Sequence, residues 1–470
     1  MISLTVEEIL KSTEGKLIYG DENNEIKKIV IDSRMADSQS LFVAVVGEVQ
    51  DGHKYINDAY QLGCRAFLIS DESFVEKELE NSSVIEVENT EIALGKIAKY
   101  YRGAFDIPVV GVTGSVGKTT TRDMIYSVLS NKFNTLKNEK NLNNQFGVPL
   151  TLFNLNRENE CAIIEMGMCG FGEIEYLVDI VRPKIGVISN IGMSHIELLG
   201  SQEGIFKAKM EIASYFDEAS TLIVNGDDKF LSEVYKEYNK GDKEGYTVYS
   251  FGKGRDNTVS CRKIVSIGDE KTLFTLSIEG IEDEIEFEIP TVGEHNVYNA
   301  MSSILVGMIL GMNIEEIKEG LLNFQATKDR QDIINTDDFT IINDVYNASP
   351  DSMIASMKVL SLYKDKRRVA ILGDCLEMGE FAEEAHRKIG VQTLDKVDVI
   401  ITTGESAEFI GTEAKERGFD LSKVYHFKTK EELIASLSDI LKKDDAILVK
   451  ASRGMKFEDI VKYIEGGCKC

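Results

Sequence analysis

The chain has 470 residues, 28% of them charged, and a formal net charge of -26 at pH 7. This length exceeds one ordinary hydrophobic core, and we expect three domains. The negative charge, with no basic block to offset it, argues against sequence-independent nucleic-acid binding. No apolar run reaches membrane-spanning length and the N-terminus lacks a secretory signal pattern, so we expect a cytoplasmic protein without membrane insertion.

The seven cysteines are scattered and odd in number, which suits reduced thiols better than a disulfide framework. Only Cys468 and Cys470 lie close together in the sequence. Since no second Cys or His pair lies near them, we expect a solvated tail there and not a metal site.

The first hundred residues predict a small α/β domain. Strand-like runs cover residues 28–31 and 41–46, and a helical pattern covers residues 55–62. A linker-like stretch follows at residues 102–106. We therefore place the first domain at residues 1–103.

The most informative motif lies at residues 114–120, which read Gly-Ser-Val-Gly-Lys-Thr-Thr. It follows an apolar run at residues 107–112 and precedes a helical stretch at residues 121–132, the order of a nucleoside triphosphate site. Lys118 can supply a positive charge to the β- and γ-phosphates, and the Thr119 hydroxyl can ligate Mg²⁺.

The phosphate loop is a variant of the common pattern. Val112 stands where that pattern has its first glycine, and Gly111 lies one place earlier. Glycines let backbone N–H groups approach phosphate oxygens closely, which is what this chemistry needs. The residues expected to contact the phosphates are Gly114, Ser115, Val116, Gly117, Lys118, Thr119 and Thr120.

The rest of the central region predicts a parallel sheet covered by helices. Buried-strand runs alternate with helical patterns at residues 162–165, 185–189 and 221–224. The segment 259–289 alternates and is rich in Thr, Ile, Phe and Glu, which favours a β-ribbon at the sheet edge. A long helix is predicted at residues 296–310, and we place this domain at residues 104–328.

Polar side chains that follow these strands are candidates for metal chemistry. Glu165 ends an apolar strand beside the phosphate loop, where a carboxylate can hold a metal ion, orient water or merely cap a turn. His195 follows another strand, although a lone histidine is more often an ordinary residue. Lys207 and Lys209 lie in a helical stretch, and position alone singles out neither because helical lysines are usually solvated.

Amides mark the start of the long helix. Residues 293–299 place Asn296 and Asn299 one turn apart on the same helical face. They could read an adenine edge or belong to a helix N-cap, and their spacing leaves both interpretations open.

The C-terminal third predicts a Rossmann-like α/β domain, which we place at residues 329–470. Its strand-like runs alternate with helices and lie at residues 340–342, 368–372, 398–402 and 446–450. The loop 343–352 follows the first of these strands and breaks into a turn before a helix. Loops of this kind bind ligands in open α/β sheets.

Together these segments resemble the Mur ligase family, ATP-dependent enzymes that form amide bonds in peptidoglycan precursor synthesis. The resemblance covers nearly the whole chain. Residues 190–201, 344–352 and 372–380, with His386 after them, resemble the member that joins D-alanyl-D-alanine to UDP-N-acetylmuramoyl-tripeptide. The resemblance implies a UDP-substrate domain, a central phosphate-loop ATPase domain, and a C-terminal domain that closes over ATP and binds the dipeptide.

The nearest alternatives are other members of that family. The sister enzyme that adds a diamino acid typically has Ala-His where this chain has Tyr346-Asn347, and an Asp-Asn-Pro motif that this chain lacks. The segments 32–34 and 51–53 argue against a folate polyglutamylating enzyme. A phosphate-loop ATPase used as a switch, with no ligated product, is the alternative from another class.

The resemblance also implies a metal site. Lys118 and the loop amides would hold the ATP phosphates, Thr119 and Glu165 would hold one Mg²⁺, and His195 would help to hold a second. Lys209 matches the family lysine that CO₂ carbamylates, which converts a cation into a carboxylate able to reach that second metal. The expected catalytic residues are Lys118, Glu165, His195 and Lys209.

Further residues are implied at binding surfaces. The adenine-binding segment of the family matches His295, Asn296 and Asn299. Arg330 and Asp344 match third-domain groups that would reach the nucleotide when the domains close. The uridine diphosphate end of the substrate would meet Ser33, Arg34, Phe42, Asp51 and His53. The peptide-bearing substrate and the dipeptide would meet Asn143, Asn144, Tyr346, Asn347 and Ser352.

Departures from the family pattern are few. Val116 stands where a small polar residue is frequent and Arg122 where a lysine is frequent, and neither side chain has an identifiable role at this stage. The implied partners are the UDP-linked tripeptide and D-alanyl-D-alanine, and we expect a monomer.

Overall fold

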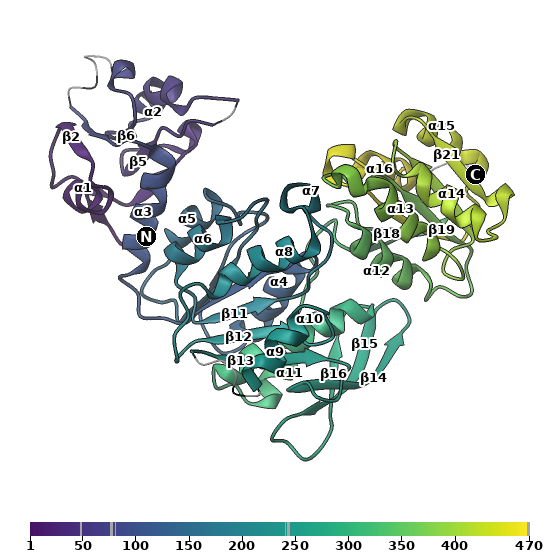
Figure 1. Ribbon diagram of the computed structural model, residues 1–470. Coiled ribbons are helices and arrows are strands. Elements are labelled where there is room, and N and C mark those ends of the chain that lie inside the picture. The colour runs from purple at the N-terminus through teal and green to yellow at the C-terminus, as the bar shows by residue number, and fades with distance from the viewer. Residues whose placement is uncertain (48, 76–78, 80, 240, 242–244, 468–470) are drawn as a thin grey trace.

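The computed structural model describes all residues except 48, 76–78, 80, 240, 242–244 and 468–470, so Cys468 and Cys470 lie outside the described residues. The described residues form three α/β domains that follow one another along the chain (Figure 1). The expected fold class is therefore confirmed. No helix in the described ranges is both long and apolar enough to cross a membrane.

The first domain, purple to blue in Figure 1, is built on a sheet of order β2-β7-β6-β5-β4, in which β2 runs antiparallel to β7. A small antiparallel pair, β1 and β3, lies beside it. The strands are β1 (Leu4–Thr5), β2 (Lys16–Tyr19), β3 (Glu25–Ile26), β4 (Lys28–Val30), β5 (Ser40–Val43), β6 (Ala66–Ile69) and β7 (Ser83–Glu86). The helices are α1 (Val6–Thr13), α2 (Ile56–Gln61) and α3 (Thr90–Arg102).

Strand β5 shows why this sheet is buried on both faces. Successive side chains of a strand point to opposite faces. Leu41 and Val43 join the core cluster shared with α1 and α3, whereas Phe42 joins the cluster under α2. The predicted strands and helix of this domain are confirmed with bounds shifted by one to three residues.

Helix α3 attaches the first domain to the central one. The Tyr101 hydroxyl donates to the Leu155 carbonyl at 2.6 Å, and Arg102 Nε donates to the Val181 carbonyl at 3.1 Å. Both partners belong to the central domain, so α3 is packed between two sheets.

The central domain, teal to green in Figure 1, has the strand order β16-β15-β14-β13-β12-β11-β8-β10-β9. Neighbours from β9 to β14 are parallel, and β15 and β16 follow antiparallel. The strands are β8 (Val109–Thr113), β9 (Thr135–Lys137), β10 (Cys161–Glu165), β11 (Ile185–Ile188), β12 (Thr221–Asn225), β13 (Thr247–Gly252), β14 (Val259–Ile267), β15 (Lys271–Ile278) and β16 (Ile285–Ile289). The helices are α4 (Lys118–Ser130), α5 (Gly147–Leu152), α6 (Glu173–Val181), α7 (Ile196–Leu199), α8 (Gln202–Met210), α9 (Leu231–Asn239), α10 (Glu294–Ile309) and α11 (Ile314–Leu322).

This topology places the phosphate loop in the interior of the domain. Strand β8 lies between β10 and β11, so the loop that follows it has a strand end on either side. Helix α4 begins at Lys118, three residues earlier than predicted, because the loop turns directly into the helix. The predicted edge ribbon at residues 259–289 is confirmed as β14 to β16.

The C-terminal domain, yellow-green in Figure 1, has the strand order β17-β18-β22-β19-β20-β21, and only β17 pairs antiparallel among these described strands. Its fourth predicted strand, β22, lies between β18 and β19. The strands are β17 (Asp332–Asn335), β18 (Phe339–Asn343), β19 (Arg368–Leu372), β20 (Val399–Thr403), β21 (Val424–Phe427) and β22 (Asp445–Lys450). The helices are α12 (Pro350–Leu360), α13 (Ala382–Val391), α14 (Glu408–Glu416), α15 (Lys430–Ile440) and α16 (Glu458–Glu465).

Candidate active site

The strand ends of the central sheet open into a cavity of about 990 Å³, which the C-terminal domain also lines. Carboxyl ends of parallel strands are the usual ligand-binding edge of such sheets. The sequence-predicted residues that line this cavity are Ser115, Val116, Gly117, Lys118, Thr119, Thr120, Asn143, Asn144, Glu165, His195, His295, Asn296, Asn299, Arg330, Asp344, Tyr346, Asn347 and Ser352. The structure therefore brings most of the predicted nucleotide, metal and dipeptide residues to one place.

The phosphate loop depends on a glycine and on its own carbonyls. Gly117 caps α4 with a φ of 85°, a left-handed conformation that residues with a Cβ rarely adopt. The Lys118 ammonium donates to the Gly114 carbonyl at 2.8 Å, which turns it back over the loop. Burial lowers the pKa of Lys118, while the nearby Glu165 carboxylate opposes that shift.

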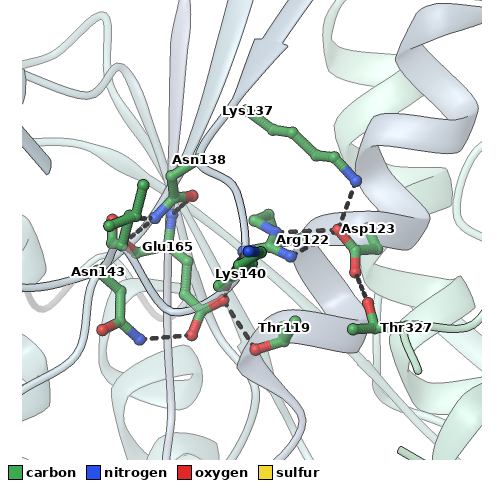
Figure 2. Close-up of polar contacts among 10 residues, drawn as sticks. Thr119, Arg122, Asp123, Lys137, Asn138, Lys140, Asn143, Glu165 and Thr327 are labelled. Carbon is green, nitrogen blue, oxygen red and sulfur yellow. Dashed lines mark hydrogen bonds and ion pairs between the residues drawn. The ribbon is translucent and has the colours of Figure 1, made fainter. Parts of the chain in front are cut away.

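Glu165 is held at the end of β10 by contacts on both carboxylate oxygens (Figure 2). The Thr119 hydroxyl donates to its Oε2 at 2.9 Å, and Asn143 Nδ2 donates to its Oε1 at 2.8 Å. The Asn138 amide bonds both the backbone N–H and the carbonyl of Glu165, at 2.9 and 3.0 Å. A hydroxyl and a carboxylate side by side are hard oxygen ligands, so these residues fit Mg²⁺.

Arg122 corrects the sequence interpretation, which assigned its side chain no role. It is 2% exposed, and its Nη1 donates to Glu165 Oε2 at 3.1 Å. Its position three residues after Thr119 on α4 was the available signal, because residues three apart share a helical face.

His195 lies at the boundary with the C-terminal domain. His195 has a φ of 65°, and its Nδ1 lies 2.7 Å from Glu377 Oε2 of the C-terminal domain. That contact holds the pKa of Glu377 below its usual range. The imidazole thus faces a carboxylate across the domain boundary.

Lys209 lies on α8 and does not line the cavity; it is 1% exposed. Among the described residues, no hydrogen bond or ion pair engages its amine. Burial, and then the positive charge of Lys118, lower the pKa of Lys209 well below its usual value. This environment favours loss of the ammonium proton relative to an exposed lysine, which position in the sequence did not reveal.

The amides at the start of α10 form a polar chain with the phosphate-loop helix. Thr121 Oγ1 donates to Asn299 Oδ1 at 3.0 Å, and Asn299 Nδ2 donates to Asn296 Oδ1 at 3.2 Å. Asn296 Nδ2 donates to the Val292 carbonyl at 2.8 Å. The N-cap of α10 is Gly293, with no side-chain cap hydrogen bond, so the N-cap interpretation of this pair is wrong, while both amides line the cavity.

The C-terminal wall contains a buried ion pair that the sequence interpretation missed. Lys450 ends β22, is 2% exposed, and donates to Asp344 Oδ2 at 2.6 Å. Opposite it, the Arg330 guanidinium lies 3.9 Å from the ring centre of Tyr346. A lysine at the end of a predicted buried strand was the available signal for Lys450.

Arg34 and Asp32 of the first domain form a local pair outside this cavity. Arg34 Nη2 donates to Asp32 Oδ2 at 2.6 Å, and the Arg34 side chain is 86% exposed. The Asp32 carboxylate also accepts from the Arg34 backbone N–H at 3.0 Å. The Arg34 guanidinium, although paired with Asp32, is therefore accessible to a ligand from solvent.

Other predicted substrate residues of the first domain are interior. Phe42 is 1% exposed and packs edge-on against Phe67. His53 is 3% exposed; its Nδ1 lies 2.7 Å from Asp51 Oδ1, and its Nε2 accepts from the Ser70 N–H at 2.9 Å. These placements argue for structural roles of Phe42 and His53, because neither presents free atoms to a ligand. Ser33, also buried, begins the short 3-10 turn beside Arg34.

Comparison with known proteins agrees with this geometry. Models of the Mur ligase family catalytic domain, the Mur ligase middle domain and the Mur ligase glutamate ligase domain match residues 25–102, 112–307 and 329–453. A Bacillus subtilis (strain 168) protein named UDP-N-acetylmuramoyl-tripeptide--D-alanyl-D-alanine ligase is 39% identical over 466 residues, covering 98% of both chains. The chain belongs to the Mur ligase family.

Solved structures of MurF proteins are similar to this Mur ligase over nearly its whole length. MurF from Acinetobacter baumannii superimposes with a TM-score of 0.89 at 30% identity over 99% of both chains. MurF from Thermotoga maritima in complex with ADP gives a TM-score of 0.82 at 26% identity, over 94% of this chain and 98% of that one. The family expectation is confirmed and with it an ATP-dependent ligase, so a phosphate-loop switch is set aside.

Proposed function

We propose that this Mur ligase joins D-alanyl-D-alanine to UDP-N-acetylmuramoyl-tripeptide and converts ATP to ADP and phosphate. The observation that carries the proposal is the single cavity in which Thr119 and Glu165 face the C-terminal loop that contains Tyr346. The relative that is 39% identical over nearly the whole chain carries the name of that ligase.

The chemistry requires activation of a carboxylate, because direct attack by an amine would have to expel oxide. We propose that the tripeptide carboxylate attacks the γ-phosphorus of ATP to give an acyl phosphate and ADP. The dipeptide amine then attacks the acyl carbon, and phosphate leaves. The first step brings two anions together, so Lys118 and the loop N–H groups are the chain's means of neutralising the transferred phosphoryl group.

The first proposed metal site uses Thr119 and Glu165, which already contact each other in the structure. Mg²⁺ would add positive charge at the transferred phosphoryl oxygens, held by Thr119 and Glu165, with a second ion near His195 and a carbamylated Lys209. The lowered pKa of Lys209 makes the neutral amine, the form that reacts with CO₂, easier to reach. His195 contacts Glu377 through Nδ1, so its Nε2 is the atom that would hold a metal.

The proposed division of labour follows the domains, at residues 1–103, 104–328 and 329–470. Arg34 with Ser33 and Asp51 would meet the uridine diphosphate, and Asn143 and Asn144 the peptide. The nucleotide would lie among His295, Asn296, Asn299, Arg330 and Asp344. The dipeptide would lie beside Tyr346, Asn347 and Ser352.

We further propose that the C-terminal domain closes over ATP before chemistry, because an acyl phosphate is lost readily to water. A monomer is sufficient for this arrangement, since one chain supplies every proposed group. We propose a cytoplasmic reaction, because ATP and UDP-linked precursors are metabolites of that compartment.

The deciding experiment measures ADP release with each substrate omitted in turn. We expect turnover only when both UDP-N-acetylmuramoyl-tripeptide and D-alanyl-D-alanine are present. UDP-N-acetylmuramoyl-dipeptide with a free diamino acid is the control for the sister ligase, which adds the third peptide residue. Robust ADP release without the dipeptide would overturn the proposal.

A further inference from the structure

A buried arginine is shared between two carboxylates beside the proposed metal site. Arg122 Nη1 donates to Glu165 Oε2 at 3.1 Å, while its Nε and Nη2 donate to Asp123 Oδ1 at 3.0 and 2.8 Å. Figure 2 shows the guanidinium between these carboxylates. Arg122 is 2% exposed and Asp123 is 5% exposed, so both side chains are almost fully removed from solvent.

Asp123 is also held from its far side. Lys137 donates to Asp123 Oδ1 at 2.8 Å, and the Thr327 hydroxyl donates to Asp123 Oδ2 (Figure 2). Burial opposes ionisation of Asp123, yet Arg122, Lys137 and Thr327 hold its pKa below the usual range. The carboxylate is therefore charged, and its orientation depends on all three donors.

Thr327 belongs to the interdomain linker, residues 323–331 between α11 and β17. Beyond Thr327, the linker contains Asp329 and Gln331 with φ values of 63° and 54°. Gln331 then donates through its backbone N–H to Asp344 Oδ1 at 3.3 Å, at the C-terminal wall of the cavity. The Thr327 hydroxyl is thus a contact between the linker and the cluster around Glu165.

The geometry of the cluster links the orientation of Arg122 to Glu165. The two cations, Arg122 and Lys137, already balance the two carboxylates in charge. Arg122 nevertheless reaches the same Glu165 oxygen that accepts from Thr119. The guanidinium is a rigid planar fork, so a movement of Asp123 that turns the fork also moves Nη1 relative to Glu165.

We propose that Arg122 and Asp123 are positioning residues that fix the orientation of the Glu165 carboxylate. Through its contact with Asp123, Thr327 makes this orientation depend on the position of the interdomain linker. This inference rests on the proposed role of Glu165 in holding Mg²⁺. It adds a route by which the C-terminal domain acts on the metal-holding carboxylate without touching it.

The test uses Thr327→Val, which removes the hydroxyl and keeps the shape. Mg²⁺ is titrated into full-length protein with ADP present, and binding is followed by calorimetry. Partners of metal ligands commonly change metal affinity by about tenfold or more, and Thr327 lies two contacts beyond Arg122, the direct partner of Glu165. We expect its half-saturating Mg²⁺ concentration to rise about three- to tenfold.

The chain offers matched controls. Thr327→Ser retains the hydroxyl and should restore the Mg²⁺ dependence of the unmodified chain. Ser127 on α4 donates to the Gly320 carbonyl at 2.6 Å, so it joins the same helix to the segment before the linker without touching Arg122. Ser127→Ala should leave the Mg²⁺ dependence unchanged.

A second variant tests whether the effects share one route. Arg122→Lys keeps the charge but has no fork to bridge two carboxylates, so we expect about a tenfold loss in Mg²⁺ affinity. Combined with Thr327→Val, the two losses should not add, because both act through Asp123 and Arg122. If Arg122→Lys does not fold, Thr327→Val and its controls decide alone.

The outcomes separate this inference from the proposed function. If Thr327→Val behaves like Ser127→Ala, or if the two losses add, the link to the linker is overturned. If Glu165→Gln leaves the Mg²⁺ dependence unchanged, the proposed metal role fails and the inference falls with it. A sensitive Glu165→Gln with an insensitive Thr327→Val overturns only the inference.

Discussion

The cavity around Glu165 and the first-domain surface around Arg34 hold their charges in different ways. Glu165 is 1% exposed and receives Thr119, Arg122 and Asn143 from separate segments. Arg34 has an 86% exposed side chain, and its partner Asp32 lies two residues away. One region is organised by the fold and the other by a local turn.

The difference follows from the cost of burying charge. A buried carboxylate must have its partners in place, since an unpaired charge in the interior is strongly unfavourable. An exposed pair contributes little and is screened by salt, so it can exchange its partner for a ligand. We therefore expect substitutions in the cavity to affect turnover and substitutions at the surface to affect substrate affinity.

The largest expected effect comes from the cavity. Lys118→Ala removes the cation from the phosphate loop and should lower kcat about a hundredfold or more, because it removes charge needed in the transition state. ADP release at saturating substrates measures it. Lys207→Ala, on the exposed side of α8, is the control. A loss below about tenfold would contradict a phosphate-holding role.

Lys209→Ala should have the next largest effect. If the lysine acts as a carbamate, its removal should cost about tenfold to a hundredfold in turnover, as expected for a lost metal contact. Added bicarbonate or a short carboxylate should restore part of the activity. If the turnover of Lys209→Ala is unchanged, this lysine has no role in the active site.

Arg34→Ala tests the surface side of the comparison. The KM for the UDP-linked substrate should rise about two- to fivefold with kcat unchanged, because an exposed charge contact is weak. The difference from the unmodified chain should shrink as salt is added. A fall in kcat at saturating substrate would show that this surface does more than bind.

Phe42→Leu should have the smallest effect on catalysis. Its ring packs in the first-domain core, so the substitution should lower the free energy of unfolding by about 1–2 kcal/mol. Urea unfolding measures that loss, and the KM for the UDP-linked substrate should stay unchanged. A raised KM with an unchanged free energy of unfolding would indicate that Phe42 contacts the substrate.

Sequence patterns predicted the elements that dominate both regions. Buried apolar runs predicted β10 and β11, and the position of Glu165 at a strand end predicted its place beside Thr119. The short or half-buried strands β17 and β21 were missed, because an edge strand carries few consecutive apolar residues.

Interior partners could not be predicted in the same way. In the sequence, Arg122 looks like any solvated helical arginine. Its burial follows only from the packing of β10 beside α4. His195 meets Glu377, which lies in another domain, and no spacing rule connects the two.

By itself the sequence determined the α/β class and the phosphate loop, because these depend on local periodicity, on glycine positions and on the order of elements, and its longer motifs carried the resemblance to the family. Only the tertiary structure decided that Phe42 and His53 are interior and that Arg122 and Thr327 join the cluster around Glu165. The reason is physical: burial and charge pairing depend on which segments pack together, and that packing brings together residues far apart in the chain.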